Sequence, residues 1–256
     1  MPDPPVRLDA ELVRRGLARS RGQARELVAQ GSVLVDGRPA TKPSTPVTSV
    51  VAIDLAQAPE RWVGRAAYKL LAALDLFDLD VTGRRCLDVG ASTGGFTQVL
   101  LEAGAAHVTA LDVGHGQLVP EVAEDPRVEE RSGTNIRDVT PGDLGAPFEI
   151  VVADLSFISL RLVLPVLPPL MTADADAILL VKPQFEVGRE RLARTGVVTS
   201  PNERQRVLDE VVRAAADVGL RQRGLQPSPL PGTTGNQEYL LWVTTGLGPP
   251  REQGAP

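Results

Sequence analysis

Asp88-Val-Gly-Ala-Ser-Thr-Gly-Gly-Phe96 is the stretch of this 256-residue chain that decides its fold. It closes the apolar run Arg85-Cys-Leu-Asp-Val89 and predicts a strand, a glycine turn and the start of a helix. Glycines in such a turn let the backbone approach a ligand at the carboxyl edge of a sheet. Their positions, Gly90, Gly94 and Gly95, depart from the G-x-G-x-x-G spacing of dinucleotide sites, which disfavours a nicotinamide dehydrogenase. A plain strand–turn–helix scaffold is the alternative.

Asp88 indicates what kind of ligand this turn would take. A carboxylate repels the oxygens of a pyrophosphate, whereas it suits a cationic ligand that carries an amino acid, so we predict S-adenosylmethionine as the cofactor. Asp112 ends the next predicted strand, where an acid holds ribose hydroxyls in nucleotide-binding α/β folds, although it could equally cap a helix. The predicted cofactor contacts are Asp88, Gly90, Ser92, Gly94, Phe96 and Asp112.

Strand and helix signals alternate from residue 70 onward, which is typical of a parallel sheet with helices on both faces. We therefore predict an α/β fold of the Rossmann-like, doubly wound kind, with helices between the strands. The predicted strands are 85–89, 107–112, 148–154, 177–181 and 237–244, and a long helix is predicted over 202–218.

The first 55 or so residues predict a separate, small α+β unit. Two short helices are expected, the second capped by Ser20 with Gln23, followed by strands at 32–35 and 50–54. The expected division is a domain at 1–58, a linker at 59–64, a second domain at 65–246 and a disordered tail at 247–256.

Charged residues follow two of the apolar strands at the edge where open α/β sheets bind ligands. Asp154 precedes Leu-Ser-Phe, and Lys182 begins Lys-Pro-Gln-Phe-Glu. Lys182 and Lys69 are two of only three lysines in a chain with 24 arginines. These two positions could therefore need a compact or deprotonatable amine, which arginine cannot supply. Glu238 near the last strand would complete a Lys-Asp-Lys-Glu set. A surface ion pair is the alternative for Asp154 and Lys182.

The arginines of the first unit indicate a nucleic-acid surface, although the whole chain carries a net charge of −5. Six arginines fall between Arg7 and Arg25, and a solvated helix face is the alternative reading. The predicted RNA contacts are Arg7, Arg14, Arg15, Arg19 and Arg21.

Composition excludes several other classes. One cysteine, Cys86, allows no internal disulfide, and two histidines with it cannot build a Cys/His zinc cluster, so no metal site is expected. No basic-then-apolar leader is seen, and Pro165, Pro168 and Pro169 break the most apolar stretches before a membrane span is reached. We expect a cytoplasmic protein without a membrane partner.

Five motifs together give the chain a resemblance to the TlyA family over nearly its whole length. They are Arg7 to Arg21, Asp88 to Phe96, Ala153-Asp-Leu-Ser-Phe-Ile-Ser159, Val181-Lys-Pro-Gln-Phe-Glu-Val-Gly188, and Ser228-Pro-Leu-Pro-Gly232 through Gly235-Asn-Gln-Glu-Tyr239. The resemblance implies an RNA-binding domain of the ribosomal-protein S-four type and an FtsJ-like, class I methyltransferase domain. It implies methylation of cytidine 2′-hydroxyls in large-subunit and, for the longer type, small-subunit ribosomal RNA, a modification linked to capreomycin sensitivity.

The same resemblance implies a catalytic set of Lys69, Asp154, Lys182 and Glu238, with ribosomal RNA or ribosomal subunits as partners. We expect a monomer. The chain departs from the family at Arg65-Ala-Ala-Tyr-Lys-Leu, where relatives have a glycine. Lys182 would take or polarise the hydroxyl proton and Asp154 would orient it. Whether Lys182 is a base stays open, because Asp154 favours its charged form while burial and Lys69 favour the neutral one.

Two rival functions remain beside the methyltransferase. The family also carries the label hemolysin, but a membrane-lytic protein should show a long apolar or amphipathic basic segment, and none is found in the sequence. A catalytically silent RNA-binding protein would share the first domain and would not bind S-adenosylmethionine.

Overall fold

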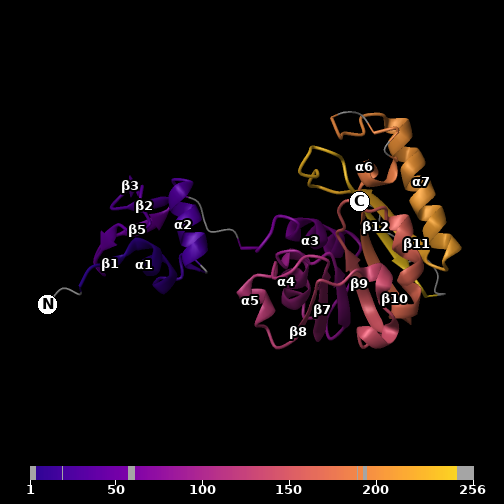
Figure 1. Ribbon diagram of the computed structural model, residues 1–256, viewed down its shortest axis with the longest axis horizontal. Coiled ribbons are helices and arrows are strands. Elements are labelled where there is room, and N and C mark those ends of the chain that lie inside the picture. The colour runs from indigo at the N-terminus through magenta and orange to yellow at the C-terminus, as the bar shows by residue number, and fades with distance from the viewer. Residues whose placement is uncertain (1–3, 19, 57–60, 189, 193–194, 247–256) are drawn as a thin grey trace. The chain divides into compact units, whose positions relative to one another are not determined.

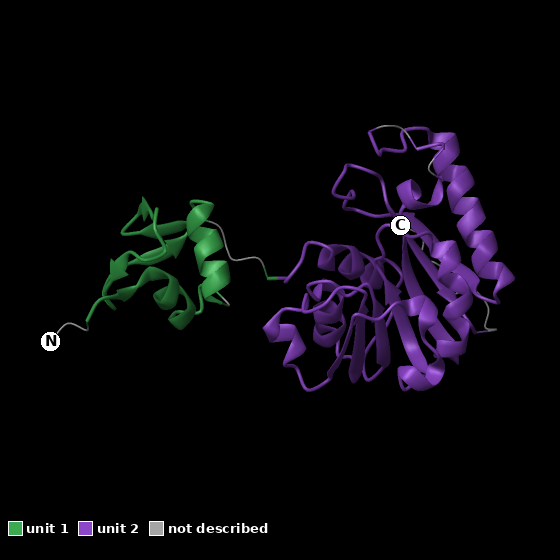
Figure 2. Cartoon of the chain, in the orientation of Figure 1, with its two compact units in different colours: residues 1–61 green, residues 62–256 purple. Residues whose placement is uncertain are grey.

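A computed structural model describes residues 4–18, 20–56, 61–188, 190–192 and 195–246. The chain divides into two compact units, residues 1–61 and 62–256 (Figure 2). The division falls inside the stretch 59–64 that we expected to be a linker. Arg19, part of that linker and the expected tail 247–256 lie outside the described residues.

The first unit packs two short helices against small antiparallel sheets. Leu8 and Leu12 put a buried stripe on the first helix, and the second begins after Ser20, whose Oγ accepts a hydrogen bond from the backbone N–H of Gln23. Strand order is β3-β2-β5 in one sheet, and β1 pairs with β4 in another. The elements are β1 (Val6–Arg7), α1 (Leu8–Arg14), α2 (Arg21–Ala29), β2 (Val33–Val35), β3 (Arg38–Pro39), β4 (Pro46–Val47) and β5 (Ile53–Leu55).

The strand predicted at 50–54 lies further along the chain than we expected. Val50 is 84% exposed, and the strand begins only at Ile53, which is buried and pairs with Val35. Burial of Ile53 therefore sets the register, whereas apolar character alone wrongly included Val50.

The second unit is built on a seven-stranded, mostly parallel sheet of order β11-β12-β10-β9-β6-β7-β8 (Figure 1). Only β12 runs antiparallel to its neighbours, β10 and β11. The strands are β6 (Arg85–Val89), β7 (His107–Asp112), β8 (Val128–Ser132), β9 (Phe148–Ala153), β10 (Met171–Val181), β11 (Arg221–Pro227) and β12 (Tyr239–Thr244). The main helices are α3 (Ala67–Leu76), α4 (Gly95–Glu102), α5 (Pro120–Ala123), α6 (Pro183–Glu186) and α7 (Pro201–Asp217).

Both faces of this sheet are covered, so its central strands are apolar on both sides. Cys86 and Ile150 pack with α3 and α4 on one face, while Leu87 and Val151 pack with α7 on the other. The result is a three-layer α/β fold, which confirms the predicted fold class. The strand order reverses at β6, because the chain first adds β7 and β8 on one side of it and then places β9 on the other side. Ligands of open α/β sheets bind at such a reversal of strand order.

The segment between β9 and β10 differs from the helix that we expected there. It forms three short 3₁₀ turns, Leu160–Leu162, Leu164–Val166 and Pro168–Leu170. Its prolines lack the N–H that a longer helix needs, so the segment turns repeatedly while Leu164 and Leu167 stay buried.

Candidate functional site

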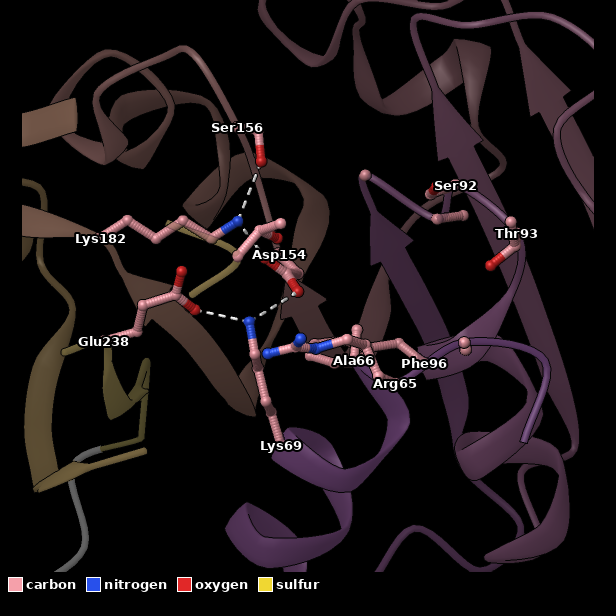
Figure 3. Close-up of a pocket in the computed structure, with 15 residues that line it drawn as sticks. Arg65, Ala66, Lys69, Ser92, Thr93, Phe96, Asp154, Ser156, Lys182 and Glu238 are labelled. Atoms are coloured by element: carbon pink, nitrogen blue, oxygen red, sulfur yellow. Dashed lines mark hydrogen bonds and ion pairs between the residues drawn. The ribbon is translucent and has the colours of Figure 1, made fainter. Parts of the chain in front are cut away.

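A cavity of about 280 Å³ opens at the carboxyl edge of the sheet, at the β6–β9 reversal (Figure 3). Its walls come from the first turn of α3, the glycine turn after β6, and the segments that follow β9 and β10. The fifteen residues that line it are Gly64, Arg65, Ala66, Lys69, Gly90, Ala91, Ser92, Thr93, Gly95, Phe96, Asp154, Ser156, Lys182, Thr233 and Glu238. Residues far apart in sequence thus form one site.

The four charged residues of the predicted set meet on one wall of this cavity (Figure 3). Lys182 Nζ lies 2.6 Å from Asp154 Oδ1, and Lys69 Nζ lies 3.7 Å from Asp154 Oδ2. Lys69 Nζ also donates a hydrogen bond of 2.5 Å to Glu238 Oε2. All four side chains are largely buried, and their formal charges sum to zero, which offsets the cost of burying them. Their roles in chemistry stay a prediction.

The glycine turn forms the opposite wall, and Gly90 must be a glycine for two reasons. Its φ of +85° is a conformation that side chains disfavour, and a Cβ would lie 2.8 Å from the carbonyl oxygen of Asp154. Gly94, predicted as a cofactor contact, is absent from the cavity lining; its φ is +98°, and a Cβ would press against Leu118 and Val122. Gly94 therefore allows the turn to pack closely against Leu118 and Val122.

A second cavity of about 470 Å³ adjoins the first and shares with it Gly90, Ser92, Asp154 and Ser156. Asp112 lines this second cavity. Its carboxylate accepts hydrogen bonds from the backbone N–H groups of Ser92, at 2.8 Å, and Gly114, at 2.7 Å. Asp112 thereby joins the turn after β6 to the turn after β7 beside a space of nucleoside size.

Asp88 lies beneath the turn, not in the cavities as we expected of a cofactor contact. It is fully buried, and its Oδ2 accepts a hydrogen bond of 2.7 Å from Thr97 Oγ1 on α4. Burial raises the pKa of Asp88 to about 7, and the nearby Asp154 and Asp112 act in the same direction. The geometry makes Asp88 a support of the turn, because its strand position points it into the α4 layer.

Sequence reasoning missed three residues of the site. Ser156 Oγ accepts a hydrogen bond of 3.0 Å from Lys182 Nζ. Phe157 is 91% exposed with a φ of +65°, and its ring lies 5.3 Å from that of Phe185. Both rings line a third cavity of about 760 Å³ that also borders Lys182 and Glu238. Their place in the motifs was a signal, but aromatic residues beside apolar strands are more often buried.

The predicted RNA-contact arginines that the structure describes fall into two groups in the first unit, and Arg25, which was not predicted, joins the first group. Arg7, Arg21 and Arg25 converge on the fully buried carboxylate of Asp9, with contacts of 3.0, 3.1 and 3.4 Å. Their guanidinium groups, Arg7 first, hold the pKa of Asp9 well below its usual range. Three positive charges around one negative charge leave a net positive surface that suits phosphates.

The second group is centred on Glu11, which is buried and contacts Arg14 and Arg15. These two guanidinium groups, Arg14 first, lower the pKa of Glu11 to about 2. Arg15 also donates to the carbonyl oxygens of Val51, at 2.7 Å, and Thr48, at 3.2 Å. Arg15 thus ties α1 to a neighbouring loop, which is a structural task, while Arg14 remains well exposed.

The sheet order, the glycine turn and the acid at the end of β7 define an α/β enzyme of the nucleoside-cofactor class. Comparison with known proteins narrows this class. The pattern of the FtsJ-like methyltransferase family matches residues 62–245, and that of the S4 domain, the S-four type named above, matches residues 6–49.

Several relatives match nearly the whole length of the chain. The chain is 54% identical to the 16S/23S rRNA (cytidine-2′-O)-methyltransferase TlyA of Mycobacterium tuberculosis, over 94% of this chain and 90% of the relative. It is 40% identical to the rRNA methyltransferase YqxC of Bacillus subtilis, over 92% and 84%. A solved structure described as a hemolysin from Streptococcus thermophilus has a TM-score of 0.73 at 36% identity, over 97% of this chain and 91% of that one.

The chain belongs to the FtsJ-like methyltransferases and, among them, to the TlyA family. This confirms the resemblance on which the catalytic set was inferred. Within the part of the chain that the structure describes, no helix has the length and apolar character of a membrane span.

Proposed function

We propose that this protein transfers the methyl group of S-adenosylmethionine to the 2′-hydroxyl of cytidines in ribosomal RNA. The observation that carries the proposal is the meeting of Lys69, Asp154, Lys182 and Glu238 on one wall of a cavity whose other wall is the glycine turn. The names of the M. tuberculosis and B. subtilis relatives support the substrate class. The relative named for both ribosomal RNAs favours small- and large-subunit RNA as substrates.

The cavities fit S-adenosylmethionine. Gly90 lines both cavities, so the backbone of the turn borders the space a ligand would fill, and Asp112 lines the adjoining space, where a ribose would bring its hydroxyls to a carboxylate. Ser92 and Phe96 would contact the amino-acid end. The cofactor, when bound, supplies a methyl group made electrophilic by the attached sulfonium.

Lys182 and Asp154 would act on the hydroxyl of the substrate. Lys182 Nζ lies between Asp154 and Ser156, so its remaining N–H can donate to the 2′-oxygen and hold it in place. The Asp154 carboxylate lines the cavity beside this amine, 2.6 Å away, and would accept the hydroxyl proton as the methyl group is transferred. Fixed alignment of such reacting groups can supply about 7–11 kcal/mol of a barrier in the best cases.

Lys69 and Glu238 would hold this pair in position. Lys69 contacts both Glu238 and Asp154, so one amine connects the last strand, α3 and the segment after β9. Phe157 offers an exposed ring and Phe185 a half-buried one beside Lys182, and bases of single-stranded RNA stack on aromatic faces.

The first unit would dock the RNA through its arginine groups, and Arg7, Arg21 and Arg25 around Asp9 would contact phosphates. A monomer suffices for this scheme, since every proposed group comes from one chain. Ribosomal RNA as the substrate would place the protein in the cytoplasm.

Mapping of 2′-O-methylated riboses in ribosomal RNA, from cells with and without the gene, tests the function. We expect one or more cytidines to lose methylation in the deletion and regain it when the purified protein and S-adenosylmethionine are added. An unchanged map would contradict the proposal. Calorimetry with S-adenosylmethionine separates it from a silent RNA-binding protein, and a liposome-leakage assay separates it from a membrane-lytic one.

A further inference from the structure

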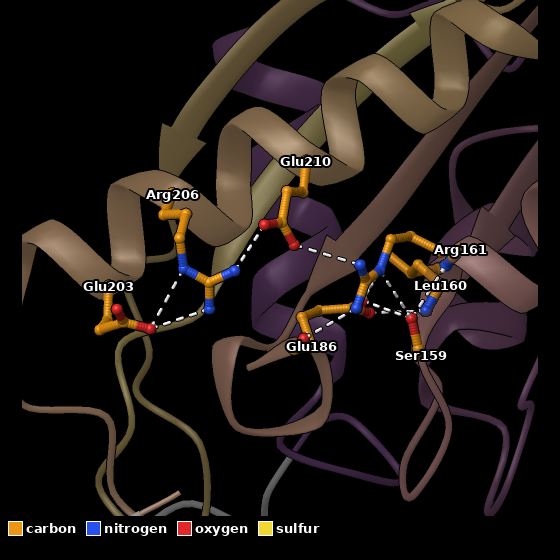
Figure 4. A network of polar contacts seen from close by, with 7 residues as sticks. All are labelled: Ser159, Leu160, Arg161, Glu186, Glu203, Arg206 and Glu210. Carbon is orange, nitrogen blue, oxygen red and sulfur yellow. Dashed lines mark hydrogen bonds and ion pairs between the residues drawn. The ribbon is translucent and has the colours of Figure 1, made fainter. Parts of the chain in front are cut away.

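Glu186 is a buried carboxylate outside the catalytic set that the mechanism has not used. It ends α6, the single helical turn that follows Lys182, and it is only 3% exposed. Its Oε1 accepts a hydrogen bond of 2.6 Å from the backbone N–H of Leu160, and its Oε2 accepts one of 2.5 Å from Ser159 Oγ (Figure 4). Both donors belong to the segment that follows Asp154.

Arg161 and α7 extend these contacts into a network (Figure 4). Arg161 donates to the Glu186 carboxylate at 3.3 Å and to the Glu186 backbone carbonyl at 2.9 Å. It also reaches Glu210 on α7 at 3.1 Å, and Arg206 links Glu210 to Glu203. The buried end of this network lies at Glu186, and its other end lies on the half-exposed face of α7.

The two segments that carry Asp154 and Lys182 are therefore joined twice. At the cavity they are joined by Lys182, which contacts Asp154 and Ser156. Four residues beyond Lys182, they are joined again by Glu186, which holds Ser159 and Leu160. Four residues lie between Asp154 and Ser159, so a shift of Ser159 and Leu160 would reach Asp154 over a short length of chain.

We infer that Glu186 is a positioning residue for methyl transfer. It clamps the segment after β9 to α6, and so holds the Lys182 amine against Asp154. A carboxylate suits this task because it accepts from Leu160, Ser159 and Arg161 at once. The inference rests on the proposed function. The alternative is that Glu186 only stabilises the fold. In that case the rate of transfer per folded molecule would not change in a Glu186 variant, whereas a positioning role lowers it.

The experiment measures transfer to ribosomal RNA from the deletion strain in six proteins. They are the wild type, Glu186→Ala, Glu186→Gln, Ser159→Ala, the double variant Glu186→Ala/Ser159→Ala, and a control. Glu210→Ala is the matched control, because it removes a carboxylate from the exposed end of the same network. Calorimetric titration with S-adenosylmethionine gives the number of folded sites and the cofactor Kd, and kcat is expressed per site.

We expect Glu186→Ala to lower kcat per site on the order of 10²-fold, with the cofactor Kd nearly unchanged, because small misplacements of reacting groups have effects of that size. Glu186→Gln keeps an acceptor for Leu160 and should recover part of the loss. Ser159→Ala should lower kcat by roughly tenfold, and the double variant should be no slower than Glu186→Ala, since residues that act as a unit are non-additive. Glu210→Ala should stay within about twofold of wild type.

Unchanged kcat per site in folded Glu186→Ala would overturn the inference. So would a double variant whose loss is the product of the two single losses, or a loss in Glu210→Ala as large as that in Glu186→Ala. Should Glu186→Ala not fold, unchanged kcat in both Ser159→Ala and Glu186→Gln overturns it instead. Failure of the wild-type protein to methylate the RNA would contradict the proposed function itself, which is a different outcome.

Discussion

Lys182 Nζ lies 2.6 Å from Asp154 Oδ1, and the two residues directly follow the neighbouring parallel strands β10 and β9. Parallel strands bring their carboxyl ends to one edge, so the sheet itself places this amine beside this carboxylate. Ser156 Oγ accepts a hydrogen bond from the same amine and fixes its direction. The pair therefore has a defined geometry before any ligand arrives, as preorganised electrostatic catalysis requires.

Removing Lys69 alone should destabilise the protein. Lys69→Met leaves Glu238 buried without its cation, and breaking a buried pair costs about 3–5 kcal/mol. The double variant Lys69→Met/Glu238→Gln should regain most of that stability, because no buried charge is left unpaired at this contact. Thermal unfolding measures both, and methyl transfer should stay impaired in both. Equal stability of the single variant and the wild type would contradict the buried-pair account.

Gly90→Ala should weaken cofactor binding. The new Cβ would lie 2.8 Å from the Asp154 carbonyl oxygen, so the turn must shift at the cavity wall. Gly83→Ala is the matched control, because Gly83 has a φ of +72° but open space around it. Both variants should lose about 1–3 kcal/mol of stability from backbone strain, whereas calorimetry should show a raised Kd for S-adenosylmethionine only in Gly90→Ala. A raised Kd in both would assign the effect to general strain.

Asp88 should make the second unit less stable as the pH rises. Its pKa is raised to about 7 in the folded protein, against about 4 in an unfolded chain. Between these values the folded state binds more protons, so the free energy of unfolding falls from about pH 4 to about pH 7. Asp88→Asn stays neutral, and its melting temperature should fall less than that of the wild type between about pH 5 and about pH 8. If the melting temperatures of Asp88→Asn and the wild type fell equally with pH, the raised pKa of Asp88 would be contradicted.

Changing Arg21 to glutamine should affect RNA binding, whereas changing Arg15 to glutamine should affect thermal stability. Arg21 is half exposed in the Asp9 group, so Arg21→Gln should weaken RNA binding and reduce the salt dependence of log K by roughly one phosphate contact. Arg15→Gln loses hydrogen bonds to Val51 and Thr48 and should lower the melting temperature with little change in salt dependence. Filter binding at several salt concentrations and thermal unfolding check this. A loss of RNA binding in Arg15→Gln and of thermal stability in Arg21→Gln would contradict the roles given to these two arginines.

The central strands and the charged site could be predicted from sequence because one physical cause governs both. β6 and β7 are buried on both faces, which produces continuous apolar runs, and their bounds match the predicted strands. Parallel pairing then brings residues that follow such runs to one edge. Asp154 and Lys182 were found in this way, whereas Lys69 and Glu238 needed the family resemblance.

The parts that could not be predicted depend on tertiary contacts. β8 and β11 lie at the two edges of the sheet, where sequences such as Val-Glu-Glu-Arg-Ser carry few apolar residues, so neither strand was expected. The clamp at Glu186 joins segments 26 residues apart, a contact that no local pattern reports. Asp88 was misplaced because a strand-end acid was assumed to face the ligand, although alternation puts it on the α4 side with Cys86.

Single-turnover transfer of a labelled methyl group to ribosomal RNA by Lys182→Ala, with cofactor Kd measured in the same preparation, tests the proposed chemistry most directly. The geometry predicts that the rate falls about 10²-fold or more, the range of a positioned acid–base group, while the Kd for S-adenosylmethionine stays within about threefold of wild type. A rate near that of the wild type, or equal loss of cofactor binding and transfer, would contradict the assignment of Lys182 to the reacting hydroxyl.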